Sequence, residues 1–360
     1  MKQVAFLVAL AWLCVTVSAR ADDDAKETLR MVAKAYTQNR ESFEFLDTTC
    51  ILEEGKAESI DAALAGRWNS VDFRRTARWI FDGDNEKYTF TADPRETAAN
   101  EEAMRKSLEA SRNGEQGDVD EKGFGTLTLP ARCSDRVFLR RDGYSLKSGS
   151  LIQSANLLHD VSDGEGIRST PFNMDIFGAD EFSNPGRYIR DSLRGRWPCD
   201  VERERTINGV KLIVASLRCS TTPDCKTCGP VFGFDPTRGY LPAYASLAYP
   251  RTGEVVFEVH MTQARQFPDG RWMPTELVKV HAPGRAAPFR VERLRVEKAE
   301  VEKRPDPDLF VTTIPAGVQI SAPGKQQWLT LKSAEQFRPE DLPELEQRMI
   351  ENVKKYRQLN

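Results

Sequence analysis

The residues of this sequence best suited to chemistry are its cysteines. Cys225 and Cys228 have the C-x-x-C spacing of thiol oxidoreductases, in which a helix N-terminus lowers the pKa of the first thiol. Gly229-Pro230 follows the second cysteine at once, which argues against a helix that begins at this motif. We therefore favour a structural disulfide, either local or to Cys219, over a redox site. A zinc site would need two further ligands.

The N-terminus has the pattern of a signal peptide and sets the redox context of these cysteines. Lys2 precedes the apolar run Val4–Val17, and Ala19-Arg20-Ala21 fits the small-x-small rule for cleavage before Asp22. The apolar run is shorter than a bilayer span requires, so an uncleaved anchor is the less favoured alternative. The sequence predicts a periplasmic or secreted protein, cut after Ala21 and not lipid-anchored.

Export would leave six cysteines in a compartment that permits disulfides. Asn208-Gly209 is typical of a two-residue hairpin turn, and counting outward from it places Cys199 opposite Arg218, one residue from Cys219. A single β-bulge would bring the two sulfur atoms together, which predicts a Cys199–Cys219 disulfide. The candidate disulfide residues are Cys50, Cys133, Cys199, Cys219, Cys225 and Cys228.

The other polar residues form no catalytic pattern. His159, His260 and His281 are expected on the surface or as hydrogen-bonded sheet residues. The sequence contains no nucleophile elbow, P-loop, dinucleotide fingerprint or H-E-x-x-H motif. The formal net charge of −3 gives no basic excess for a nucleic-acid partner. We expect a protein that is not an enzyme and that needs no cofactor or metal.

The segment from Cys228 to Gly324 organises the fold. Apolar residues alternate along four runs, and Pro- and Gly-containing turns such as Pro268-Asp269-Gly270 separate them. Connections this short force neighbouring strands to run antiparallel. The four predicted strands are Tyr240–Tyr249, Glu254–Phe267, Arg271–His281 and Phe289–Val301.

The rest of the chain adds helices at both ends and further hairpins. Residues Glu27–Arg40 and Pro339–Tyr356 have the apolar spacing of amphipathic helices. A strand is predicted at Phe43–Leu52, and hairpins at Val71–Phe90 and Arg136–Leu146. The fold class is mainly β (α+β): a large antiparallel sheet curved into an unclosed half-barrel, with helices packed as a lid on its concave side.

The turns of the second half carry a family resemblance. The segments concerned are Phe234–Pro242, with the sequence FDPTRGYLP, Pro268–Pro274, with PDGRWMP, Asp308-Leu309-Phe310 and Ile314-Pro315-Ala316-Gly317. This pattern resembles exported bacterial proteins with the LolA/LolB-like lipoprotein-carrier fold, most closely over residues 229–322. The resemblance implies an unclosed β-barrel with a helical lid over a hydrophobic cavity that holds acyl chains.

The signal-peptide pattern and this resemblance together give the expected domains. They are a signal peptide at 1–21, a LolA-like half-barrel at 22–324 with insertions at about 94–130 and 149–198, and a C-terminal extension at 325–360 with an amphipathic helix. Residues 94–122 have the composition of an exposed, loosely held surface segment.

The predicted function is non-catalytic binding of a lipid, an acyl chain or a lipid-modified partner in the cell envelope, as in outer membrane lipoprotein sorting. Aromatic residues of the hairpins and strands could line the ligand cavity, although each could equally fill an ordinary core. An envelope sensor or scaffold that contacts another protein is the alternative, and a thiol oxidoreductase is a third possibility. The candidate ligand residues are Trp79, Phe81, Tyr88, Phe90, Phe257 and Trp272.

Overall fold

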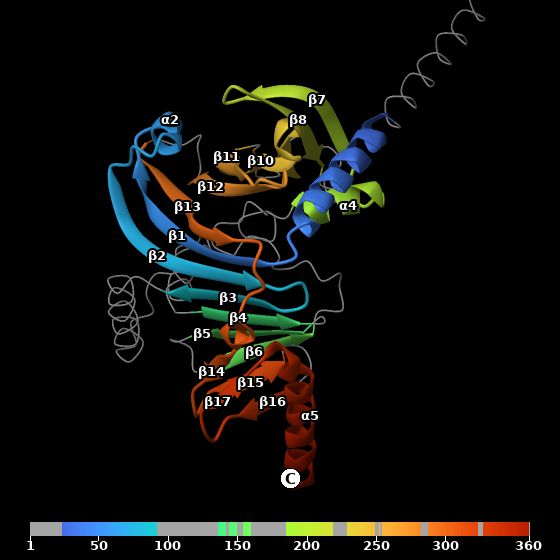
Figure 1. Ribbon diagram of the computed structural model, residues 1–360, viewed down its shortest axis with the longest axis vertical. Coiled ribbons are helices and arrows are strands. Elements are labelled where there is room, and N and C mark those ends of the chain that lie inside the picture. The colour runs from blue at the N-terminus through green and yellow to red at the C-terminus, as the bar shows by residue number, and fades with distance from the viewer. Residues whose placement is uncertain are drawn as a thin grey trace, which may run out of the picture. The chain divides into compact units, whose positions relative to one another are not determined.

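The computed structural model describes residues 24–91, 136–141, 144–149, 154–159, 185–218, 229–248, 252, 254–281, 287–322 and 327–359. Within these residues the fold is mainly β, an open antiparallel sheet with a few helices, as predicted (Figure 1). The chain forms two compact units. The first contains Met1–Ser42, Lys56–Asn69 and Ile167–Glu292, and the second contains Phe43–Gly55, Ser70–Gly166 and Arg293–Asn360.

The first unit contains the predicted meander. Its strand order is β13-β12-β11-β10-β9-β8-β7, and β13 belongs to this unit only as far as Glu292, its remaining residues being part of the second unit. The four predicted strands are confirmed as β10 to β13, and Gly270 makes the expected turn with a φ of 89°. The strands are β7 (Cys199–Ile207), β8 (Val210–Leu217), β9 (Gly229–Asp235), β10 (Leu241–Ala248), β11 (Val255–Gln266), β12 (Trp272–His281) and β13 (Phe289–Glu300).

Two helices cover one face of this sheet. Residues 24–41 form the predicted N-terminal helix, and its buried Tyr36 ring lies 6.4 Å from that of Phe234. Helix α4 (Pro185–Leu193), which the sequence did not predict, places Tyr188 5.6 Å from Phe232. Both phenylalanines are fully buried on β9, so the helices and the sheet share one apolar core.

The opposite face carries a short helix, α2 (Ile60–Leu64). Ser59 caps it by accepting a hydrogen bond from the backbone N–H of Ala62 at 3.0 Å. Its buried residue Ala63 belongs to an apolar cluster with Val278 and Val291 of the sheet. A 3-10 turn, Pro236–Arg238, follows β9.

The second unit has the strand order β16-β15-β6-β5-β4-β3-β2-β1. Its strands pair antiparallel where the register is known, with one exception: β15 pairs with β6 in parallel. A two-stranded sheet, β14-β17, accompanies it. The strands are β1 (Leu46–Ala57), β2 (Ser70–Phe81), β3 (Glu86–Thr91), β4 (Arg136–Arg141), β5 (Tyr144–Gly149), β6 (Ser154–His159), β14 (Thr312–Ile314), β15 (Gln319–Ala322), β16 (Gln327–Thr330) and β17 (Glu335–Phe337).

The C-terminal helix α5 (Leu342–Leu359) is part of the core of the second unit. Leu342, Leu345 and Met349 are almost fully buried, in one cluster with Ile80 and Leu146 of the sheet. The 3-10 helices Pro307–Phe310 and Pro339–Asp341 lead into β14 and α5. Residues 327–359 therefore belong to the same unit as much of the predicted half-barrel segment.

Several predictions lie outside the described residues. These are the signal peptide, the insertion at about 94–130 and much of the stretch 149–198, for which β6 and α4 are the described parts. In the part of the chain that can be described, no helix combines the length and the apolar character needed to cross a membrane.

Candidate functional site

The predicted ligand-binding residues are divided between the two units. Trp79, Phe81, Tyr88 and Phe90 lie on β2 and β3 in the second unit, and Phe257 and Trp272 lie on β11 and β12 in the first. The two groups are therefore described separately.

In the second unit the aromatic residues share one face of the β2–β3 hairpin. Trp79 stands directly opposite Tyr88, and Phe81, two residues farther along β2, stands opposite Glu86. The indole Nε1–H of Trp79 donates a 2.7 Å hydrogen bond to Glu86 Oε1. Trp79 is 5% exposed, whereas Phe81 and Tyr88 are partly exposed. By register Phe90 pairs with Ala77, but its side chain lies outside the described part.

In the first unit Phe257 and Trp272 do not lie together. Phe257 pairs with His281 at one end of the β11–β12 pair, and Trp272 pairs with Gln266 at the other end. His281 follows Trp272 by nine positions along an extended strand, which is about 30 Å. A compact ligand site cannot contain both aromatic residues.

Trp272 has a structural contact with the N-terminal helix. The Asn39 side chain donates to the Trp272 carbonyl oxygen at 2.8 Å and accepts from its backbone N–H at 2.9 Å. This pair of hydrogen bonds fixes the end of the helix to the start of β12. Nothing in the sequence pattern pointed to this contact, because it joins residues 233 positions apart.

Phe257 lies beside a cluster of charged side chains that the sequence analysis missed. The Lys279 Nζ atom lies 4.4 Å from the centre of the Phe257 ring, a cation–π contact. The Glu292 side chain is 2% exposed. Its Oε1 atom lies 2.9 Å from His281 Nε2 and accepts a 3.0 Å hydrogen bond from Arg290 Nη2. Burial alone would raise the pKa of Glu292, but the hydrogen bond from His281 and the charges of His281, Lys279 and Arg290 lower it to about 2.

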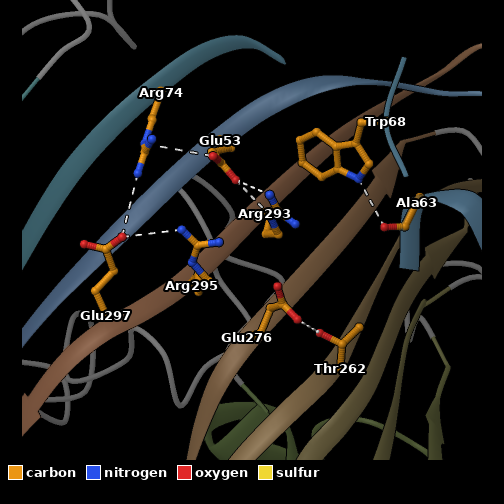
Figure 2. A network of polar contacts seen from close by, with 9 residues as sticks. All are labelled: Glu53, Ala63, Trp68, Arg74, Thr262, Glu276, Arg293, Arg295 and Glu297. Carbon is orange, nitrogen blue, oxygen red and sulfur yellow. Dashed lines mark hydrogen bonds and ion pairs between the residues drawn. The ribbon is translucent and has the colours of Figure 1, made fainter. Parts of the chain in front are cut away.

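A second polar network lies on β1, β2 and β13 of the second unit (Figure 2). The 9%-exposed carboxylate of Glu53 accepts a 2.9 Å hydrogen bond from Arg293 Nε and lies 4.0 Å from Arg74 Nε. Arg74 and Arg295 also pair with Glu297 at 3.7 and 3.4 Å. Because the outer members of the network are exposed, each outer pair contributes at most about 1 kcal/mol.

The thiols of Cys50 and Cys199 are free in the structure. Burial raises the pKa of Cys50 to about 12 and that of Cys199 to about 11, so neither is an activated nucleophile. The hairpin has a bulge between Glu202 and Arg205, but the extra residue lies in β7, so Leu217 stands opposite Cys199. The observed partner of Cys199 therefore differs by one residue from the predicted partner, Arg218.

The structure does not test the predicted Cys199–Cys219 disulfide, because Cys219 is not among the described residues. Cys133, Cys219, Cys225 and Cys228 lie outside the described residues, so the disulfide pairings and the role of the C-x-x-C motif remain predictions. Among the side chains that are described, no group of three or more His, Cys, Asp or Glu is placed to hold a metal ion.

No family model matches the sequence, and no curated protein sequence matches it either. Solved structures do match. The chain is similar to LolA-superfamily structures. A domain named for outer membrane lipoprotein sorting, from Vibrio parahaemolyticus, is 11% identical with a TM-score of 0.43, over 79% of this chain and 95% of that one.

Two further structures match over similar lengths. A DUF1329 family protein from Desulfovibrio piger is 10% identical with a TM-score of 0.43, over 79% of this chain and 97% of that one. A LolA superfamily protein from Nitrosomonas europaea is 10% identical with a TM-score of 0.40, over 77% and 94%. The turn motifs of the sequence resemble the same superfamily.

Proposed function

We propose that this protein is exported to the cell envelope and binds a lipid, an acyl chain or a lipid-modified partner without catalysing a reaction. The observation that supports this proposal most is the aromatic face of the β2–β3 hairpin. Trp79, Phe81 and Tyr88 project from one side of two paired strands, and the last two are partly accessible. Partly accessible aromatic side chains on a rigid strand pair are suited to contact with an alkyl chain.

The anchoring of Trp79 agrees with a binding role. Its indole N–H donates to the buried Glu86 carboxylate, and Thr48 Oγ1 donates to its backbone carbonyl oxygen at 3.3 Å. An indole held in this way keeps its orientation when a ligand arrives, so little side-chain entropy is lost on binding.

Substitution of one aromatic residue by an acid tests the proposal. In Phe81→Glu an unpaired carboxylate would have to be desolvated next to the ligand, so uptake of an apolar fluorescent probe or an acyl chain should be abolished. Val71→Glu is the matched control, because it places the same charge on the same strand at a side chain that is 45% exposed. The control should bind the probe as the wild type does.

Truncation separates a binding role from a purely structural one. Trp79→Ala and Trp272→Ala should weaken binding more than they lower the melting temperature if these side chains contact ligand. Truncation of a buried aromatic side chain usually lowers the free energy of unfolding by about 3–5 kcal/mol. A loss of this size in both variants, together with no uptake of acyl ligand by the wild type, would show that they are core residues. The sensor or scaffold function would then replace the carrier function.

A further inference from the structure

Strand β7 forms one end of the sheet in the first unit (Figure 1). Within the described residues it pairs with β8 and with no other strand. Every residue from Glu202 to Thr206 is exposed. The edge of a sheet presents backbone N–H and C=O groups that can pair with another strand. Residues 202–206 are therefore a surface to which a further strand could add.

The hairpin register shows which backbone groups of β7 face away from β8. Directly opposite residues of an antiparallel pair alternate between hydrogen-bonded and non-hydrogen-bonded pairs. Arg218 donates to the Pro198 carbonyl oxygen at 2.9 Å, so alternation along the strand turns the backbone groups of Val201 outward. At the other end, the two-residue turn joins a hydrogen-bonded pair, and the groups of Thr206, one position before that pair, face outward as well.

The side chains between these two residues alternate in charge. Positions 202 to 205 are Glu, Arg, Glu and Arg. When this stretch runs antiparallel to a second copy, with Val201 opposite Thr206 of the partner subunit, position 202 stands opposite 205 and position 203 opposite 204. Each glutamate of one copy then faces an arginine of the other. Opposite charges at facing positions stabilise a strand pair, and like charges destabilise it.

The two outer charged residues of this stretch are available for such pairing. Glu202 and Arg205 are exposed, and neither has an ion-pair partner among the residues that the structure describes. Both stand opposite buried residues of β8, Val214 and Leu212, whose side chains are on one face of the sheet. The two side chains therefore project to the same side of β7.

The two inner charged residues have weak partners on their own chain. Arg203 forms an ion pair with Asp24 of the N-terminal helix, and Lys211 Nζ lies 2.6 Å from Glu204 Oε1. The side chains of Arg203 and Glu204 are 63% and 64% exposed. Ion pairs this exposed contribute little to stability, so the same side chains can also pair with a second copy.

We infer that two copies of this protein associate through their β7 strands, antiparallel and in this register, so that one sheet continues into the other. The backbone groups of Val201 and Thr206 bond across the contact, and the alternating charges fix the register. The arrangement is a twofold one, because the same strand serves both copies. A run of one charge sign on this edge would repel a second copy, whereas the observed alternation attracts it. The inference concerns assembly and does not depend on the proposed lipid binding.

Sedimentation velocity of the purified protein at a series of concentrations tests the inference. The wild type should form a dimer whose fraction rises with protein concentration and falls with added salt. Glu202→Arg places like charges opposite each other and should weaken association by about tenfold or more. Glu202→Arg/Arg205→Glu restores opposite charges in the same register and should recover the wild-type affinity. Glu254→Arg, the same charge change at an exposed residue outside β7, is the control and should leave association unchanged.

Thr206→Pro tests the backbone pairing separately from the charges. It removes an N–H that faces away from β8, so the hairpin keeps its own hydrogen bonds while the bond to the second copy is lost. The dimer should weaken although the melting temperature changes little. If melting curves show that this variant is unfolded, the charge exchange between positions 202 and 205 still decides the question.

A wild type that stays monomeric at every concentration would overturn the inference, even if another protein proved to pair with the β7 edge. A dimer that Glu202→Arg weakens no more than Glu254→Arg would place the contact elsewhere on the surface. A folded double variant that does not regain affinity would show that positions 202 and 205 do not face each other. A dimer that a non-reducing gel shows to be linked by a disulfide, and that a reductant separates, would also contradict pairing through β7.

Discussion

The Nδ2 atom of Asn208 lies 2.9 Å from the Nδ1 atom of His260, although β9 and β10 separate their strands in the sheet. Asn208 occupies the tip of the β7–β8 hairpin with a φ of 50°, and His260 is a buried residue of β11 whose Nε2 lies 3.2 Å from Glu258 Oε2. The hairpin tip is therefore bound to a strand with which it does not pair.

The contact predicts a measurable stability difference between two variants of Asn208. Asn208→Gly keeps the left-handed backbone but loses the hydrogen bond, and should lower the free energy of unfolding by about 1 kcal/mol. Asn208→Ala should cost roughly 1 kcal/mol more, because an alanine is strained at this φ. Urea titration gives both values, and hydrogen exchange of β7 and β8 should rise near the tip. A glycine variant with wild-type stability and exchange would show that the contact is unimportant.

The lowered pKa of Glu292 predicts acid sensitivity with a definite sign. Because the pKa is about 2 in the folded protein and 4.5 as its ordinary value, the buried carboxylate stabilises the fold above pH 4.5, and this contribution is lost as the pH falls towards 2. The difference corresponds to about 3 kcal/mol. Glu292→Gln should be less stable than the wild type at pH 7 by an amount of this order, and the gap should narrow at pH 3.

Unfolding by urea at pH 7, 5 and 3 measures this difference. Glu254→Gln, at an exposed residue, is the control and should follow the wild type at each pH. A Glu292→Gln variant whose deficit is the same at pH 7 and pH 3 would contradict the role assigned to the carboxylate.

The buried thiol of Cys50 should be chemically inert in the native protein. With a pKa of about 12, only about one thiol in ten thousand is ionised at pH 8, and the thiol is 4% exposed. Iodoacetamide should therefore label Cys50 only after the protein is unfolded. The unfolded protein should be labelled without the addition of a reductant. Labelling of the unfolded protein that requires a reductant would instead show that Cys50 is in a disulfide, as the sequence had suggested.

The C-terminal helix should contribute to the stability of the second unit. Leu345 is 1% exposed in the cluster that contains Ile80 and Leu146, so Leu345→Ala should cost about 2–5 kcal/mol. Lys354→Ala, on the exposed side of the same helix, should change stability by less than about 0.5 kcal/mol. Thermal and urea unfolding compare the two. Equal stabilities would mean that α5 packs only loosely on the sheet.

The strands were predictable because their signals are local. The alternation of apolar residues and the turn at Gly270 predicted β10 to β13 within one residue of their observed ends. The helix at 24–41 followed from the spacing of Leu29, Val32 and Tyr36, all of which are buried.

The contacts between distant segments could not be predicted in the same way. Glu292 and Arg290 alternate with apolar residues along the strand, a pattern that is typical of exposed charges. Only the folded structure shows that the Glu292 carboxylate is buried and that His281 and Lys279 lie near it. The sequence does not show which strand of the β7–β8 hairpin carries the extra residue of a bulge. That residue lies in β7, so the predicted partner of Cys199 was wrong by one residue. Helix α4 is nine residues long and begins at a proline, in a segment without a clear pattern.

The most direct test of the proposed lipid binding is native mass spectrometry of the full-length protein, followed by organic extraction of bound lipid. We predict an additional mass that corresponds to one acyl-bearing ligand, that is recovered in the extract, and that is present in Val71→Glu but absent from Phe81→Glu. A wild-type protein that shows only its own mass, releases no lipid and takes up no added acyl chain would contradict the proposal.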